Sequence, residues 1–126
     1  MNKLNKENIT GISALLVHAA KIDEIYSEHE KDLIRNFIKS YRKDDDVGET
    51  LMKAEEIEND SNQLLNFTNI IKKNSMDIKK DIIEHLWKVI ISDNTIDQYE
   101  SNLMRRICGL IYFSDKECAE IKLKLI

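Results

Sequence analysis

The sequence predicts an all-α protein with a single domain, and three features of the chain lead to that prediction. It contains no proline and only three glycines, so it lacks the turn residues that an all-β sandwich or barrel needs about every 8–12 residues. Valine and threonine are scarce, whereas leucine, isoleucine, lysine, glutamate and asparagine are abundant. The length of 126 residues is usual for one domain and no stretch resembles a linker, so we expect one domain over residues 1–126.

Apolar residues recur at three- and four-residue spacing along most of the chain, as in amphipathic helices. The stripes, including a more polar one in the middle and a short one at the end, cover residues 9–20, 33–41, 49–59, 64–71, 78–91, 103–111 and 121–125. We therefore expect a bundle of about seven helices with short connections.

Serine and acidic residues mark several of the expected helix starts. Residues 27–30 and 114–117 fit the capping box, in which the leading serine and the closing glutamate each accept a hydrogen bond from an otherwise unpaired backbone N–H. Ser75 and Asp97 are N-cap candidates at two further starts.

The charge pattern argues against two classes of partner. The chain has 19 Lys and Arg against 23 Asp and Glu, a net charge of −4, and its basic pairs are scattered among acids. We therefore expect no nucleic-acid partner, because such binding usually uses a basic face. The apolar run at residues 9–20 is broken by polar residues and too short to cross a bilayer. We expect no transmembrane segment and a cytoplasmic location.

Cys108 and Cys118 lie ten residues apart, which matches no zinc or redox spacing, and both interrupt apolar helical stretches. They are expected to be buried small hydrophobic residues. Trp87, Tyr99 and Tyr112 are expected in the core for a similar reason. The chain shows no glycine-rich phosphate loop, nucleophilic serine motif or zinc-type histidine pattern, so we do not expect an enzyme.

The sequence repeats itself at an offset of 70 residues. Positions 23–35 contain four identities with positions 93–105, against about one expected from average composition. The identical pairs are Asp23 and Asp93, Glu30 and Glu100, Leu33 and Leu103, and Arg35 and Arg105. In both copies an apolar helix leads into the aspartate and a capped helix follows. We therefore expect two pseudo-symmetric helix–turn–helix halves, each with a D-x6-E turn.

The acidic residues of these turns have two readings. The turns are not EF-hand loops, because the upstream ligand positions carry alanine, lysine, valine and isoleucine and the required glycine is missing. If the two halves meet, however, they could pool oxygen ligands for Ca²⁺, Mg²⁺ or Mn²⁺ from Asp23, Glu30, Asp93, Asp97 and Glu100. In the other reading the same residues only cap helices and close turns.

Most of the chain resembles the TerB-like tellurite-resistance proteins. The resemblance to the C-terminal half of that family lies in EHLWKVIISD at residues 84–93, IDQYE at 96–100 and LMRRI at 103–107, and it continues through 110–117 and 119–123. The first copy of the repeat, from Ala19 to Leu33, is similar to the family's N-terminal signature.

Both turns depart from the family's A-D-G pattern. Ile22 and Ser92 stand in place of the alanine, and Glu24 and Asn94 stand in place of the glycine. Asparagine tolerates the left-handed backbone conformation that glycine supplies, whereas glutamate adopts it at a cost, so the second turn is the better match.

The resemblance implies an all-helical, pseudo-symmetric fold and an association with resistance to tellurite and other chemical stress. It also implies a metal site at the acidic turns, or a role as an interaction module like the related domains of J-domain co-chaperones. We therefore expect a non-enzymatic stress protein that binds a divalent cation. The alternative is a protein-binding module with purely structural turns.

Overall fold

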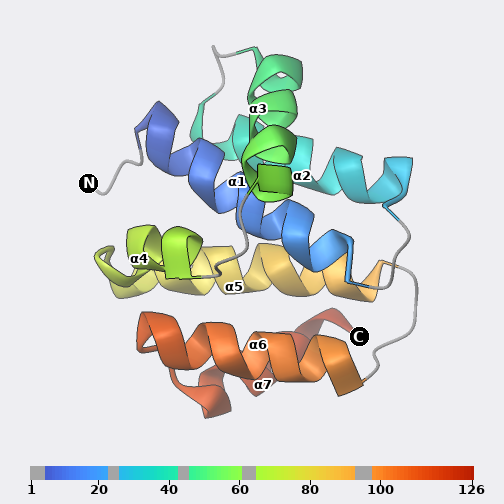
Figure 1. Cartoon of the computed structure of the whole chain (residues 1–126). Helices are drawn as coiled ribbons and strands as arrows, with labels where there is room; N and C mark the ends of the chain where they lie inside the picture. Colours follow the sequence, from blue (N-terminus) through green and yellow to red (C-terminus); the bar gives the residue numbers. More distant parts are fainter. Residues whose placement is uncertain (1–4, 23–25, 43–45, 61–64, 93–97) are drawn as a thin grey trace.

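A computed structural model of the chain describes residues 5–22, 26–42, 46–60, 65–92 and 98–126. Over this part of the chain it contains seven helices and no strand, which confirms the all-α prediction (Figure 1). The helices are α1 (Lys6–Ala20), α2 (Glu28–Tyr41), α3 (Val47–Asp60), α4 (Leu65–Lys72), α5 (Met76–Ile91), α6 (Gln98–Ile111) and α7 (Asp115–Leu125). Each helix coincides with one of the predicted apolar stripes.

Helix α1 is the central element of the bundle. It packs against α2, α3, α4 and α5, and Figure 1 shows it running between α3 and α5. Its residues 9–17, 19 and 20 are all buried, so this helix is enclosed on nearly every side. Gly11 is part of the close packing, since a Cβ there would lie 2.5 Å from the Cδ1 atom of Ile70 in α4.

The C-terminal half is built on α5, which packs against α1, α2, α4 and α7, while α6 packs against α4 and α7. Trp87 is buried in this half, as predicted, and its indole N–H donates to the carbonyl oxygen of Cys118 at 3.1 Å. Leu103 is buried, whereas its repeat partner Leu33 is only partly buried. The pseudo-symmetry of the two halves stays a prediction.

The helix starts follow the predicted capping chemistry. Ser27 and Glu30 form a complete capping box, in which Ser27 N–H donates to Glu30 Oε1 at 2.8 Å and Glu30 N–H donates to Ser27 Oγ at 3.1 Å. Ser75 caps α5. At α7 the structure shows the serine half of the predicted box, with Ser114 Oγ accepting from the Glu117 N–H at 3.3 Å.

The expectation that Tyr112 lies in the core is wrong. Tyr112 directly follows α6 and adopts the left-handed conformation, with φ 60°. The N–H of Phe113 donates to the carbonyl oxygen of Cys108 at 2.8 Å. This turn directs Tyr112 outward, 68% exposed beneath the ammonium of Lys72, and buries Phe113 instead. Tyr99 lies among the side chains that the structure does not describe.

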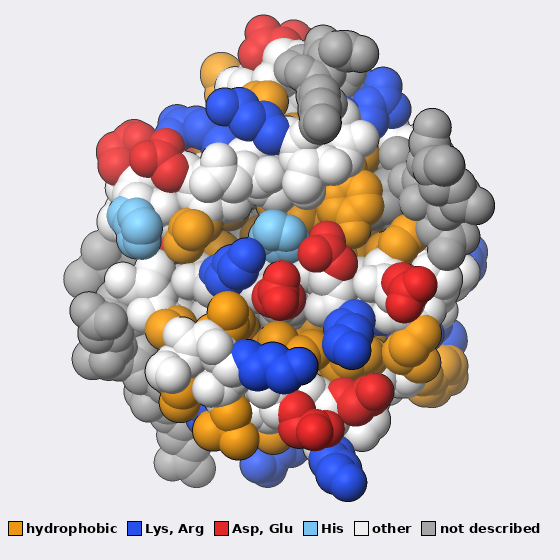
Figure 2. Space-filling model, turned by 180° about the vertical axis from the view of Figure 1, so that it is seen from behind, with side chains coloured by type: hydrophobic (Ala, Val, Ile, Leu, Met, Phe, Trp, Pro, Cys, Tyr) orange, Lys and Arg blue, Asp and Glu red, His pale blue; other side chains and the backbone are white. Residues whose placement is uncertain are grey.

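The surface carries both signs of charge in close mixture. Figure 2 shows acidic and basic side chains interleaved over one face, with hydrophobic side chains between them. Arg35, for example, pairs within its own helix with Asp32 at 2.6 Å and Glu28 at 3.3 Å. Among the described helices, none is long and apolar enough to cross a membrane.

Candidate functional site

Two of the five predicted metal ligands lie in the described part of the chain, and both are buried carboxylates. Glu30, in the first turn of α2, is 5% exposed, and Glu100, in the first turn of α6, is 2% exposed. Asp23, Asp93 and Asp97 lie outside the described residues. The structure therefore brings each predicted glutamate to the buried start of a helix.

The carboxylate of Glu30 has a structural task, because its Oε1 atom accepts the Ser27 N–H in the capping box. This contact is the one that the capping interpretation of the first acidic turn predicts. In Figure 1 the C-terminal ends of α1 and α5 and the N-terminal ends of α2 and α6 lie toward the same end of the molecule. The described helix ends that flank the two acidic turns therefore lie toward one end of the molecule.

A metal site is not assembled from the described side chains. Within those residues, no three His, Cys, Asp or Glu side chains come together in a way that could hold a metal ion. A site that pools carboxylates from both turns needs Asp23, Asp93 and Asp97, which lie outside this part of the chain. It stays a prediction.

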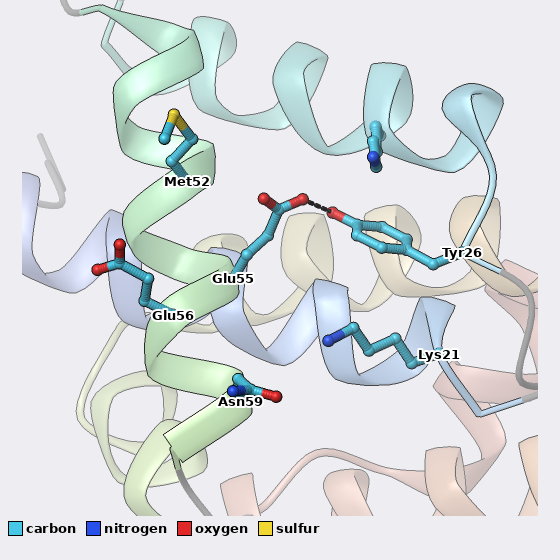
Figure 3. A pocket seen from close by; sticks show the side chains of 7 residues that line it. Lys21, Tyr26, Met52, Glu55, Glu56 and Asn59 are labelled. Atoms are coloured by element: carbon cyan, nitrogen blue, oxygen red, sulfur yellow. Dashed lines mark hydrogen bonds between the residues drawn. The ribbon is translucent and has the colours of Figure 1, made fainter.

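The structure reveals a groove beside the first turn that the sequence did not indicate. It has a volume of about 450 Å³ and lies between the end of α1, the start of α2 and one side of α3 (Figure 3). Its lining residues are Lys21, Tyr26, Lys31, Met52, Glu55, Glu56 and Asn59. Because they come from three separate segments and form no motif, no spacing in the sequence could have predicted this groove.

Tyr26 joins the two walls of the groove. Its hydroxyl donates to Glu55 Oε2 at 2.7 Å, and Figure 3 shows the two side chains reaching toward each other across the gap. Burial, and then the hydrogen bond to Glu55, raise the pKa of Tyr26 above its ordinary value. The phenol therefore stays protonated and keeps donating its hydrogen bond at neutral pH.

Two lysines flank the aromatic ring of Tyr26. The ammonium groups of Lys21 and Lys31 lie 5.8 Å and 5.0 Å from the ring centroid, within the range of a cation–π interaction. Lys21 also donates to Glu58 Oε1 at 2.8 Å, and His18 Nδ1 lies 3.3 Å from the other oxygen of the same carboxylate. These contacts fix α3 against the end of α1.

The open side of the groove is apolar and acidic. Met52 is 63% exposed, and Figure 3 shows Glu56 pointing away from Tyr26. The groove therefore offers an aromatic face, a thioether, ammonium groups and carboxylates in a small space. Such a set can recognise a ligand that carries both charged and apolar groups.

Residues 10–123 match the family described as "Tellurite resistance protein TerB". The chain belongs to the TerB family. The TerB match begins inside α1 and ends inside α7, so it includes both acidic turns and the groove. Comparison with curated proteins and with solved structures gives no match. The predicted resemblance is confirmed, and with it the association of this chain's family with tellurite resistance.

Proposed function

We propose that this TerB-family protein is a non-enzymatic, stress-associated protein that binds a divalent cation at its second acidic turn. The observation that supports the proposal is the burial of Glu100, which is 2% exposed in the first turn of α6. Asp93 and Asp97 stand seven and three residues before it in the sequence, so the second turn offers three carboxylates to one cation. The second turn is also the closer match to the family pattern, because Asn94 stands in place of the glycine.

The ligands in this proposal are Glu100, Asp93 and Asp97, with backbone carbonyls and water completing the coordination. An all-oxygen ligand set suits Ca²⁺, Mg²⁺ or Mn²⁺ better than zinc. Glu30 already serves the capping box of α2, so we assign the first turn a structural role.

Thermal unfolding with and without each cation tests the proposal. At a cation concentration about a hundredfold above Kd, a bound ion stabilises the fold by about 2.7 kcal/mol. For a chain of this size, that raises Tm by about 10 °C. Glu100→Gln and Asp93→Asn should each remove most of this increase. Glutamine can still serve in a capping box, so Glu100→Gln separates ligation from capping.

Asp46→Asn is the matched control. Asp46 Oδ1 accepts the Glu49 N–H at 3.1 Å at the start of α3, and asparagine can make the same cap. This variant removes one carboxylate from a different helix start, so its cation-dependent increase in Tm should equal that of the wild type. If millimolar Ca²⁺, Mg²⁺ and Mn²⁺ all leave the wild-type Tm unchanged, the cation proposal is wrong and capping is the whole role of Glu100.

The groove favours a second candidate function, a protein-binding module with purely structural turns. Its charges and its exposed Met52 suit an extended peptide that presents an acidic side chain to Lys21 and Lys31 and an apolar side chain to Met52. Arginine-poor, mixed-charge grooves of this kind do not suit the phosphate backbone of nucleic acids.

Peptides selected from a random library against the wild-type protein test this second function. They should carry the acidic and apolar pair, and the variants Lys31→Glu and Met52→Asp should each weaken their binding by at least about tenfold, or about 1.4 kcal/mol. Lys53→Glu is the control, since Lys53 lies on α3 but outside the groove lining. Selected peptides that bind both groove variants as tightly as the wild type would show that the groove is not the binding site.

A further inference from the structure

A small pocket lies between α5, α6 and α7, among residues that neither proposed function uses. Its volume is about 190 Å³. Its apolar lining consists of three buried residues and one exposed alanine, namely Trp87, Met104, Cys118 and Ala119. A cavity of about 150 Å³ can hold one benzene molecule, so this pocket has room for a ligand slightly larger than an aromatic ring.

The polar part of the lining carries an excess of positive charge. It consists of Ser101, Arg105, Asp115 and Lys122. The ammonium of Lys122 lies 5.4 Å from the centroid of the Trp87 ring, within the range of a cation–π interaction. With two cationic side chains and one carboxylate, the pocket complements a ligand that carries a single negative charge.

Arg105 differs from its repeat partner in its charged surroundings. Arg35 pairs within α2 with two carboxylates, those of Asp32 at 2.6 Å and Glu28 at 3.3 Å. At the equivalent positions, 70 residues later, the sequence carries the neutral residues Asn102 and Gln98. Arg105 has no ion pair with any other residue that the structure describes. Its guanidinium therefore remains available to an anion in the pocket.

We propose that this pocket binds a small organic monocarboxylate whose apolar body is about the size of an aromatic ring. Arg105 and Lys122 bind the carboxylate, since a planar guanidinium can donate to both of its oxygens. The apolar body packs against Trp87 and Met104. Asp115 disfavours a ligand with a second negative charge. None of the ligands proposed for the cation lines the pocket, so this binding is separate from cation binding.

Benzoate is the first probe, because it combines one carboxylate with one aromatic ring. Trp87 is the only tryptophan in the chain, so its indole N–H gives a single indole signal in a proton–nitrogen correlation spectrum. This N–H donates to the carbonyl oxygen of Cys118, another residue of the lining. At constant ionic strength and with EDTA present, benzoate should shift the signal until it saturates. EDTA removes divalent cations, so the result does not depend on the cation proposal.

Three related probes separate the charge of the ligand from its ring. Benzamide keeps the ring without the charge, acetate keeps the carboxylate without the ring, and sulfate is an inorganic anion. Because the proposal requires the carboxylate and the apolar body together, each should bind the wild type at least about tenfold more weakly than benzoate.

Substitutions in the lining test the two cations. Arg105→Gln and Lys122→Gln should each raise the Kd for benzoate at least about tenfold. Arg106→Gln is the matched control, since Arg106 is the next residue of α6, is exposed and does not line the pocket. It should leave the Kd unchanged.

Ala119→Leu tests the cavity without changing its charges. Ala119 is exposed on α7 and lines the pocket, so a larger apolar side chain there should fill the space and abolish benzoate binding. Circular dichroism checks the folding of each variant. The comparison of probes on the wild type needs no variant and tests the proposal by itself.

Four results would overturn the proposal. The first is a Trp87 signal that benzoate does not shift, or shifts without saturation. The second is benzamide binding as tight as that of benzoate, which would exclude a role for the charges. The third is acetate or sulfate binding as tight as that of benzoate, which would exclude the apolar contact. The fourth is an equal loss of affinity in Arg106→Gln and Arg105→Gln, which would indicate nonspecific attraction to surface charge.

Discussion

Ser13 places a hydroxyl in the interior of α1 without a hydrogen-bond partner. Its side chain is fully buried, and its Oγ atom is unpaired within the described part of the chain. An unpaired buried hydroxyl costs about 1–3 kcal/mol, and alanine is the better helix former. We expect Ser13→Ala to raise the free energy of unfolding by about 1–2 kcal/mol, measured by urea denaturation.

Thr10 provides the matched control in the same helix. It is also buried, but its Oγ1 donates to the carbonyl oxygen of Lys6 at 2.8 Å. Thr10→Val removes a paired hydroxyl while keeping the branched shape, so it should lower the free energy of unfolding by about 1 kcal/mol. If Ser13→Ala destabilises the protein as much as Thr10→Val does, Ser13 has a partner after all.

The end of α6 shows where residue-by-residue interpretation of the sequence stops. The prediction that Cys108 and Cys118 are buried is confirmed. Tyr112, however, was misplaced, because the left-handed turn after α6 puts Phe113 in the core instead.

Two glycines inside helices differ in how much space surrounds them. A Cβ on Gly109 in α6 would meet no atom within 4 Å, whereas one on Gly11 in α1 would lie 2.5 Å from Ile70 Cδ1. Alanine in place of glycine favours a helix by about 0.5–1 kcal/mol. Gly109→Ala should therefore stabilise the protein by about that amount. Gly11→Ala should be neutral or destabilising by up to about 2 kcal/mol, because Ile70 has to move.

A double variant isolates the contact between α1 and α4. Ile70→Val removes the Cδ1 atom that the new methyl group would meet. In the Ile70→Val background, Gly11→Ala should become stabilising, like Gly109→Ala. Denaturation curves of the wild type, the two single variants and the double variant give the coupling free energy between positions 11 and 70. Equal effects of Gly11→Ala in both backgrounds would place the strain somewhere other than Ile70.

The helices themselves were predictable because their causes are local. Apolar spacing marked every one of the described helices, and Ser27, Ser75 and Ser114 marked three of their starts. The groove was not predictable, because it arises only when the end of α1, the turn before α2 and one side of α3 come together. For the acidic turns the sequence predicted the capping role of Glu30, which the box of α2 confirms, but it did not predict that Glu30 and Glu100 are buried. Cation binding remains a prediction.

The whole molecule should be most stable in a window between weak acid and weak alkali. On the alkaline side, Tyr41 donates to Asp81 at 2.6 Å between α2 and α5, and Tyr26 donates to Glu55. Burial, and then the carboxylate, raise the pKa of both tyrosines. They stay neutral in the fold but ionise near pH 10 when unfolded. Their contribution is therefore complete below about pH 10 and is lost as the pH rises above it.

On the acid side the corresponding group is His85. It packs edge-on against Phe37, and burial lowers its pKa although Asp81 opposes this effect. The ring stays neutral in the fold, whereas the unfolded chain binds a proton near pH 6.5. Its contribution is therefore present above about pH 6.5 and is lost as the pH falls below that value.

Melting temperatures measured across the pH range check both edges of this window. Tyr41→Phe and Tyr26→Phe should each make the alkaline fall in Tm shallower, and His85→Gln should do the same for the fall that begins near pH 6.5. Lys53→Glu, on an exposed part of α3, should move neither edge. A wild-type Tm that does not decline above about pH 10 would contradict the role of the tyrosines.

The central position of α1 also has a consequence for how the protein is made. Every helix that covers α1 follows it in the chain, and α5 ends 71 residues after α1 does, at Ile91 against Ala20. Ribosomes add about 5–20 residues per second, so for several seconds the nascent chain carries this apolar helix without the complete set of helices that cover it. The helix that organises the finished bundle is therefore the segment that a nascent-chain chaperone has most reason to hold.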